Sequence, residues 1–119
     1  MKFYLLILSL LITIPSFSQS KQYMDANFSV TDDVSKAKYF RLVQFKDSLY
    51  ESKVYYLTGD IMMIGTYTDE NLQIENGEFK YYFANANIES TGLYNNGLKI
   101  GYWKRWTFEG TKKEDRYYR

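Results

Sequence analysis

The chain has 119 residues, with 15 lysine and arginine residues against 14 aspartate and glutamate residues and a formal net charge of +1. This length is enough for one domain and too short for two domains with separate cores. The near-balanced charge argues against a nucleic-acid binder, which needs a basic excess to neutralise phosphates, and against strong electrostatic docking on an anionic membrane. Histidine and cysteine are both absent, which excludes a histidine-based serine triad, a thiolate nucleophile and the commonest transition-metal ligands.

The first 18 residues have the pattern of a bacterial secretory signal peptide. Lys2 precedes an apolar stretch over residues 3–14, and Ser16 and Ser18 are the small residues, two positions apart, that a signal peptidase needs. We therefore expect cleavage after Ser18 and an exported protein, periplasmic or secreted. The alternative, a membrane anchor, would need roughly 20 apolar residues to span a bilayer, and this stretch is shorter. Without a cysteine for lipid attachment, we expect no stable membrane insertion after cleavage.

Residues 19–52 are predicted to form an N-terminal segment with one strand, within the same domain as the rest. Residues 19–28 are polar and without periodicity, which indicates an extended or mobile start. Residues 31–37 fit one short helical turn, because a threonine and two aspartates at its start can accept from free backbone amides. Residues 39–45 alternate in the manner of a strand.

Residues 53–119 contain three predicted hairpins. In each, two strand-like runs flank a short junction rich in glycine, asparagine, aspartate or threonine. The paired runs are 53–57 with 61–67, 81–84 with 88–94, and 102–108 with 112–118. The predicted fold is therefore all-β, an antiparallel meander that forms a twisted, mostly single-layer sheet. The short N-terminal segment, irregular or helical, is expected to cover one end or one face of it.

The three hairpins repeat one another, with periods of 27 and then 24 residues. The corresponding positions are Tyr55, Tyr82 and Trp106 before the turn, Gly59, Ala86 and Gly110 in it, Gly65, Gly92 and Arg116 after it, and Tyr67, Tyr94 and Tyr118 last. Such periods predict a repeat array in which each hairpin contacts mainly its neighbours. The glycines expected to serve the repeat geometry are Gly59, Gly65, Gly77, Gly92, Gly97, Gly101 and Gly110. Because Ala86 and Arg116 stand at glycine positions, we expect a different second turn and a modified edge at the end of the array.

A Gly-x-aromatic start, an aromatic-x-x-x-Gly turn and a Gly-x-Tyr sequence recur in residues 77–86, 92–97 and 101–110. This pattern resembles the variant MORN repeat of bacterial proteins known as the YwqK-type antitoxin component, over about residues 55–118. The resemblance implies a meandering sheet and a scaffold or interaction role rather than an enzyme. The antitoxin role itself implies a cytoplasmic partner, which conflicts with the predicted export, and is not carried over.

Carboxylates remain as candidates for catalysis or for binding calcium. Glu75 with Glu78, or Glu114 with Asp115, could supply an acid and a base, but nothing in the sequence fixes their separation. Two sets of side-chain oxygens are candidate calcium ligands: Asn85, Asn87 and Glu89, and residues 69–71. Neither set has a known loop spacing, and turn chemistry explains them equally well. We therefore expect no enzyme activity, no metal and no cofactor.

The C-terminal hairpin interleaves basic and aromatic side chains. Such a mixture can stack on sugars or dock a protein, or it can simply discourage edge-to-edge aggregation of a sheet. The candidate binding residues are Tyr82, Tyr94, Trp103, Lys104, Arg105, Trp106 and Tyr118. The leading hypothesis is an exported, non-catalytic protein-interaction or scaffold module whose partner is another envelope or secreted protein. The alternative is a carbohydrate or cell-wall binding module that uses the same rings as exposed aromatics; nucleic acid is not an expected partner.

Overall fold

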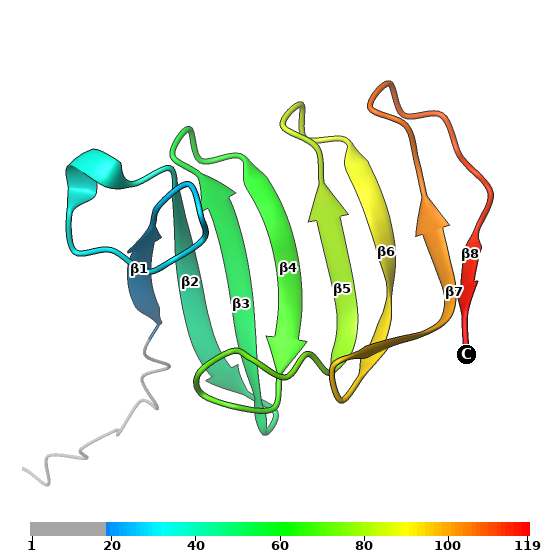
Figure 1. Ribbon diagram of the computed structural model, residues 1–119, viewed down its shortest axis with the longest axis horizontal. Helices are drawn as coiled ribbons and strands as arrows, with labels where there is room; N and C mark the ends of the chain where they lie inside the picture. Colours follow the sequence, from blue (N-terminus) through cyan, green and yellow to red (C-terminus); the bar gives the residue numbers. More distant parts are fainter. Residues whose placement is uncertain (1–18) are drawn as a thin grey trace, which may run out of the picture.

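The structure is a computed structural model that describes residues 19–119, so the predicted signal peptide lies outside the described residues. It contains an open antiparallel sheet of eight strands, in which the order in space is the order in the chain (Figure 1). The strands are β1 (Ser20–Met24), β2 (Tyr39–Lys46), β3 (Leu49–Tyr56), β4 (Ile61–Tyr67), β5 (Gly77–Tyr82), β6 (Ile88–Asn95), β7 (Leu98–Arg105) and β8 (Arg116–Tyr118). Each strand pairs with its neighbour in sequence, so the predicted all-β meander is confirmed. Within residues 19–119, no helix is long and apolar enough to cross a membrane.

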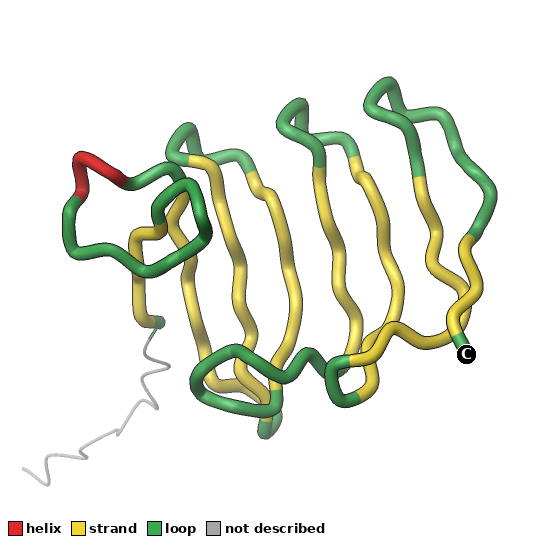
Figure 2. The backbone as a smooth tube through the Cα atoms, in the orientation of Figure 1, coloured by secondary structure: helices red, strands yellow, loops and turns green. Residues whose placement is uncertain are grey.

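The N-terminal segment contains more strand than the sequence indicates. β1 pairs along its full length with β2, where an extended or mobile start was expected, and β3 begins at Leu49. Residues 19–52 therefore contribute two strands and the first part of a third. The strands of this segment extend the sheet at one end, and the loop between β1 and β2 lies over that end, with the Phe28 ring stacked on the Tyr39 ring at 4.7 Å (Figure 2). The backbone groups of β2 provide the hydrogen-bonding partners for β1, so a polar stretch becomes a strand without an alternating pattern of its own.

The short helical turn expected within residues 31–37 is confirmed. A 3₁₀ turn spans Val34–Lys36, and the Asp33 carboxylate accepts a hydrogen bond from the Ser35 backbone N–H at 3.0 Å. This turn lies between β1 and β2, beside Ala37, which is buried.

The three predicted hairpins are β3–β4, β5–β6 and β7–β8, and their turns lie at the same end of the sheet (Figure 1). Each turn closes through backbone bonds of 2.8–2.9 Å from the N–H of its first residue to the carbonyl of its last, over residues 56–60, 83–87 and 107–111. The pairs Tyr55 and Ile61, Tyr82 and Ile88, and Trp106 and Lys112 oppose each other just before these turns. Pairing and turn bonds repeat at the periods read from the sequence, so the internal repeat is a property of the backbone.

The different turn expected in the second hairpin does not occur. Ala86 has a φ of 70°, in the same left-handed region as Gly59 at 96° and Gly110 at 97°. Its N–H bonds to the carbonyl of Phe83 at 3.0 Å, as the N–H of Gly59 does to Tyr56 at 2.9 Å. The closing hydrogen bonds therefore hold an alanine in a conformation that favours glycine.

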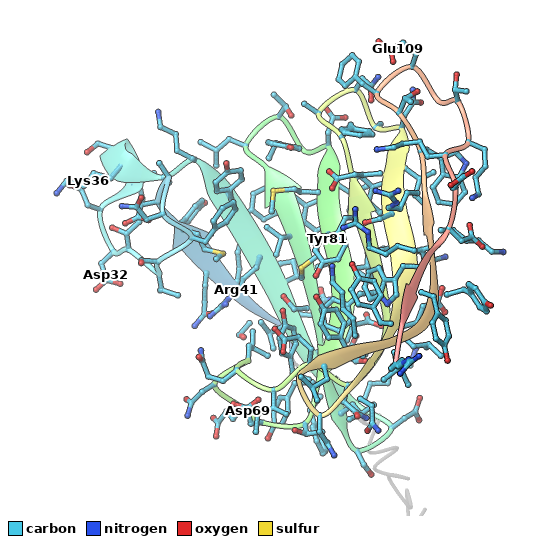
Figure 3. The ribbon with its side chains drawn as sticks, turned by 45° about the vertical axis from the view of Figure 1, so that its right-hand side comes forward. Asp32, Lys36, Arg41, Asp69, Tyr81 and Glu109 are labelled. Carbon is cyan, nitrogen blue, oxygen red and sulfur yellow. The ribbon has the colours of Figure 1, made fainter. Side chains whose placement is uncertain are left out.

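Large buried side chains gather on one side of the sheet, which we call the aromatic face. Five rings from consecutive strands meet edge to face, with centroids 5.4 Å apart for Tyr67 and Phe79, 4.7 Å for Phe79 and Tyr94, 5.2 Å for Tyr94 and Trp103, and 6.3 Å for Trp103 and Tyr118. Met24, Val54 and Met63 complete the core on this side. Figure 3 shows Tyr81 among the side chains gathered there. The other side, the opposite face, carries ion pairs of 3.7 Å between Lys53 and Glu51 and between Lys80 and Glu78.

Two repeat glycines make room for the rings. A Cβ at Gly65 would lie 2.1 Å from the Phe79 ring, and one at Gly92 would lie 2.3 Å from the Trp103 ring. Each glycine thus seats the ring of the next hairpin in the array. Arg116, at the third position of this kind, lies opposite Trp103 on β8, the last strand of the sheet. Among the described residues, the glycine position of the third hairpin thus carries an arginine on an edge strand.

Candidate functional site

A hollow of about 410 Å³ opens on the aromatic face at the C-terminal end of the sheet, and we call it the C-terminal hollow. Its lining comes mainly from β6, β7, β8 and the two turns that join paired strands there. The lining residues are Phe83, Glu89, Ser90, Lys99, Trp103, Arg105, Trp106, Lys113, Arg116 and Tyr118.

The pleat and the β-bulges explain how these residues reach one face. Trp103 and Arg105 alternate with Lys104 along β7, so the first two point to the aromatic face and Lys104 to the opposite face. The register shift near each turn inserts one extra residue, and in the first hairpin this residue is Met62, which packs against the core. Glu89 and Lys113 hold the same place in the second and third hairpins, so they turn toward the same face.

The C-terminal hollow is strongly cationic. It has four basic side chains, Lys99, Arg105, Lys113 and Arg116, against a single carboxylate, that of Glu89. In the part of the chain that the structure describes, none of the four basic side chains lies in an ion pair. Their positive charge is therefore available to a ligand.

Two observations place these positive charges beside Trp103 and Tyr118. Lys99 Nζ lies 4.6 Å from the ring centroid of Trp103 and 5.4 Å from that of Tyr118. The pKa of the Tyr118 hydroxyl is lowered, chiefly by its hydrogen bond with Arg116. Burial opposes this, and the nearby charges of Lys99, Arg116 and Arg105 lower the pKa further. The cations thus surround the end of the aromatic series.

The sequence-predicted binding residues separate into three groups. Trp103, Arg105, Trp106 and Tyr118 line the C-terminal hollow. Tyr94 lies on the same face but packs in the core, with its hydroxyl 3.3 Å from that of Tyr81. Tyr82 and Lys104 lie on the opposite face, as the alternation of β5 and β7 requires.

Neither tryptophan presents a free ring face inside the hollow. Trp103 is 2 % exposed and is a core residue. Trp106 borders the hollow, but its pairing with Lys112 turns its ring to the opposite face, where Lys112 Nζ lies 5.4 Å from the ring centroid. The basic and aromatic residues that interleave in the sequence therefore do not form one surface, because the pleat of the strands divides them between two faces.

Sequence reasoning missed Phe83, Glu89, Ser90, Lys99 and Lys113 as parts of the site. A signal for the location was present in the repeat itself. Arg105 occupies the position of Val54 and Tyr81 in the first two hairpins, and Arg116 that of Gly65 and Gly92. Both arginines thus replace small or apolar residues of the aromatic face, and their neighbours in space are the residues that were missed.

The candidate catalytic and calcium-binding groups take part in local structure. The Asp69 carboxylate, in the loop labelled in Figure 3, accepts from the backbone N–H of Gln73 at 3.0 Å and of Ile74 at 2.9 Å. The amides of Asn85 and Asn87 donate to the Phe108 carbonyl at 2.8 and 3.0 Å, which ties the second turn to the third. Among residues 19–119, no group of three or more acidic side chains is placed to hold a metal ion.

The candidate acidic pairs are placed by different local contacts. Glu78 lies on the opposite face beside Lys80, whereas Glu75 lies in the loop between β4 and β5. Asp115 pairs with Lys112 at 2.5 Å, and the backbone carbonyl of Glu114 accepts from Arg105 Nε at 3.3 Å.

The chain matches no known family model, and no curated protein or solved structure is significantly similar to it. Its function is therefore argued from the residues and from the geometry of the C-terminal hollow.

Proposed function

We propose that this chain is an exported, non-catalytic interaction module of the MORN-repeat type, which binds a partner protein in the C-terminal hollow. The observation that carries the proposal is the group of four basic side chains, without carboxylate partners in the described residues, that the sheet gathers in one hollow. If these lysines and arginines served only to keep the sheet edge solvated, they would not need to line one hollow together. The expectation of export rests on the signal-peptide pattern of residues 1–18.

The scaffold suits a binding role. Arg105 and Lys99 lie on β7, whose position is fixed by pairing on both sides and by the buried Trp103 ring. Side chains on paired strands are held more firmly than side chains on loops, so less conformational entropy is lost when a partner binds. Three of the acidic side chains, Asp69, Glu78 and Asp115, bond within their own loop or pair with a lysine.

Site-specific photo-crosslinking in the producing cells tests the proposal. A benzophenone amino acid replaces Phe83, which lines the hollow, and in a matched control it replaces Tyr102, which is 69 % exposed on the opposite face. We expect one discrete protein adduct from position 83, recovered in the envelope or the medium, and no corresponding adduct from position 102. Identical adducts from both positions, or none from position 83, would contradict binding in the hollow.

The carbohydrate alternative has a separate test. Because Trp103 is buried, quenching of tryptophan fluorescence by soluble peptidoglycan fragments would report on Trp106. Lys112 Nζ already lies over the Trp106 ring, so one face of this ring is partly covered and less available to stack on a sugar. Strong quenching together with the absence of any protein adduct from position 83 would favour the carbohydrate module over the protein-binding module.

A further inference from the structure

Two departures from the internal repeat coincide in space. In the first two hairpins, the positions equivalent to Arg105 hold core residues, Val54 and Tyr81. The positions equivalent to Arg116 hold glycines that seat a ring of the next hairpin. In the third hairpin both become arginine, on the neighbouring strands β7 and β8, and both line the C-terminal hollow. The packing of the first two hairpins does not require arginine at either position. Departures of this kind from a repeat are expected at functional positions.

Guanidinium groups at these two positions define a ligand chemistry. Each presents a planar fork of N–H donors that fits a carboxylate through two parallel hydrogen bonds. Lys99 and Lys113 add two further positive charges, and Glu89 supplies the only opposing carboxylate of the lining. A ligand with several negative charges is therefore favoured, and attraction is stronger in a hollow beside buried rings than in open water.

This inference rests on the proposed function and names the ligand of the same hollow. We propose that the C-terminal hollow binds an acidic peptide segment of the partner protein, with Arg105 and Arg116 as its carboxylate-binding pair. A peptide is favoured over an acidic polysaccharide because β8 is the last strand of the sheet. Among residues 19–119, no further strand pairs with the outer edge of β8, and a peptide laid along that edge can pair with its backbone groups.

The test uses the purified protein and a fluorescent octaglutamate peptide, with octaglutamine as the uncharged probe and fluorescence anisotropy as the readout. The double variant Arg105→Gln, Arg116→Gln is compared with Lys80→Gln, Lys104→Gln, which removes the same charge from the opposite face. We expect the first to weaken binding of octaglutamate roughly tenfold or more and the second to change it less than about twofold. Glu89→Gln is expected to strengthen binding, because it removes a like charge facing the ligand.

Several results would overturn the assignment. These are equal affinity for octaglutamine, equal losses in the two double variants, or tighter binding of polygalacturonate than of octaglutamate. If circular dichroism shows that the arginine double variant does not fold, Arg105→Gln against its neighbour Lys104→Gln gives the same comparison. If octaglutamate does not bind while the protein adduct from position 83 persists, the acidic ligand is wrong and the proposed function stands; if both are absent, both fail.

Discussion

Gly65 and Gly92 are required for space rather than for backbone freedom. We expect Gly92→Ala to lower the free energy of unfolding by about 1–3 kcal/mol, because its Cβ would lie 2.3 Å from the ring of Trp103, which is 2 % exposed and cannot move aside freely. Urea denaturation measures the change. The steric cause is checked by the pair Gly92→Ala with Trp103→Leu, in which the smaller side chain should recover part of the loss.

Gly59→Ala provides the contrast. No atom lies within 4 Å of a Cβ at Gly59, but its φ is 96°. The cost there is expected to come from backbone strain, about 1–2 kcal/mol, and to be independent of any ring. If Trp103→Leu relieved both glycine variants equally, the distinction between space and strain would be wrong.

Ala86 is a residue at which the natural sequence is not optimal for stability. Its left-handed φ of 70° is closed by the same turn bonds as at the equivalent glycines, so Ala86→Gly should relieve strain without altering the turn. We expect the free energy of unfolding to rise by about 0.5–1 kcal/mol, since the greater freedom of glycine in the unfolded chain offsets part of the gain. Thermal unfolding followed by circular dichroism checks this, and an unchanged or lower midpoint would contradict it.

At the scale of elements, the tyrosines of the aromatic face make stability sensitive to alkali. Burial, with a smaller contribution from Glu75, raises the pKa of Tyr67 to about 12. Burial and the hydrogen bond with Tyr94 raise the pKa of Tyr81 well above its usual value. Because these pKa values are higher in the folded protein than in the unfolded chain, the stabilisation is complete below about pH 10 and is lost as pH rises toward 12 and beyond.

We therefore expect the free energy of unfolding to fall steadily above pH 10. The variant Tyr81→Phe should show a shallower fall, since one of the strongly shifted groups is gone. Urea denaturation between pH 8 and pH 12 measures the slopes. Equal slopes for the wild type and Tyr81→Phe would show that this hydroxyl does not contribute.

An element is predictable from the sequence when its own residues specify it, and not when a neighbouring strand does. The turns of the three hairpins and the strand 61–67 follow directly from turn residues and strand-forming residues, and the structure confirms them. β1 was missed because its pairing comes from β2 rather than from its own pattern. In the last hairpin, β7 ends at Arg105 and β8 covers only Arg116–Tyr118, since the bulge near Lys113 interrupts a run that reads as continuous strand.

The site was predicted only in part for a related reason. Composition shows that cations and rings concentrate in the last hairpin, but the division of Trp103 and Trp106 between two faces depends on the pleat and on the bulge. Lys99 and Glu89 precede the predicted C-terminal hairpin, residues 102–118, in which the basic and aromatic side chains interleave. The departures from the repeat at Arg105 and Arg116 were visible, and superposing the three hairpins residue by residue would have placed both on the aromatic face.

At the scale of the whole molecule, stability is shared between neighbours. The sheet is open, and its strands contact mainly the strands beside them (Figure 1). Interior strands such as β5, which carries the fully buried Phe79, have a partner on both sides, whereas β1 and β8 have one partner each among the described residues. In such an array, local opening is expected to begin at the ends and to require progressively more free energy toward the middle.

Hydrogen exchange followed by mass spectrometry should reveal this gradient. We expect backbone amides of β4, β5 and β6 to exchange most slowly and those of β1 and β8 most rapidly. Removal of residues 116–119 takes away β8 and the last ring of the aromatic series, so it should accelerate exchange in β7 and leave β2–β4 close to the wild type. Acceleration in all strands alike would mean that the sheet opens as one cooperative unit. In that case the C-terminal hollow would depend on the entire array. Partner binding there would then also slow hydrogen exchange in the strands at the N-terminal end.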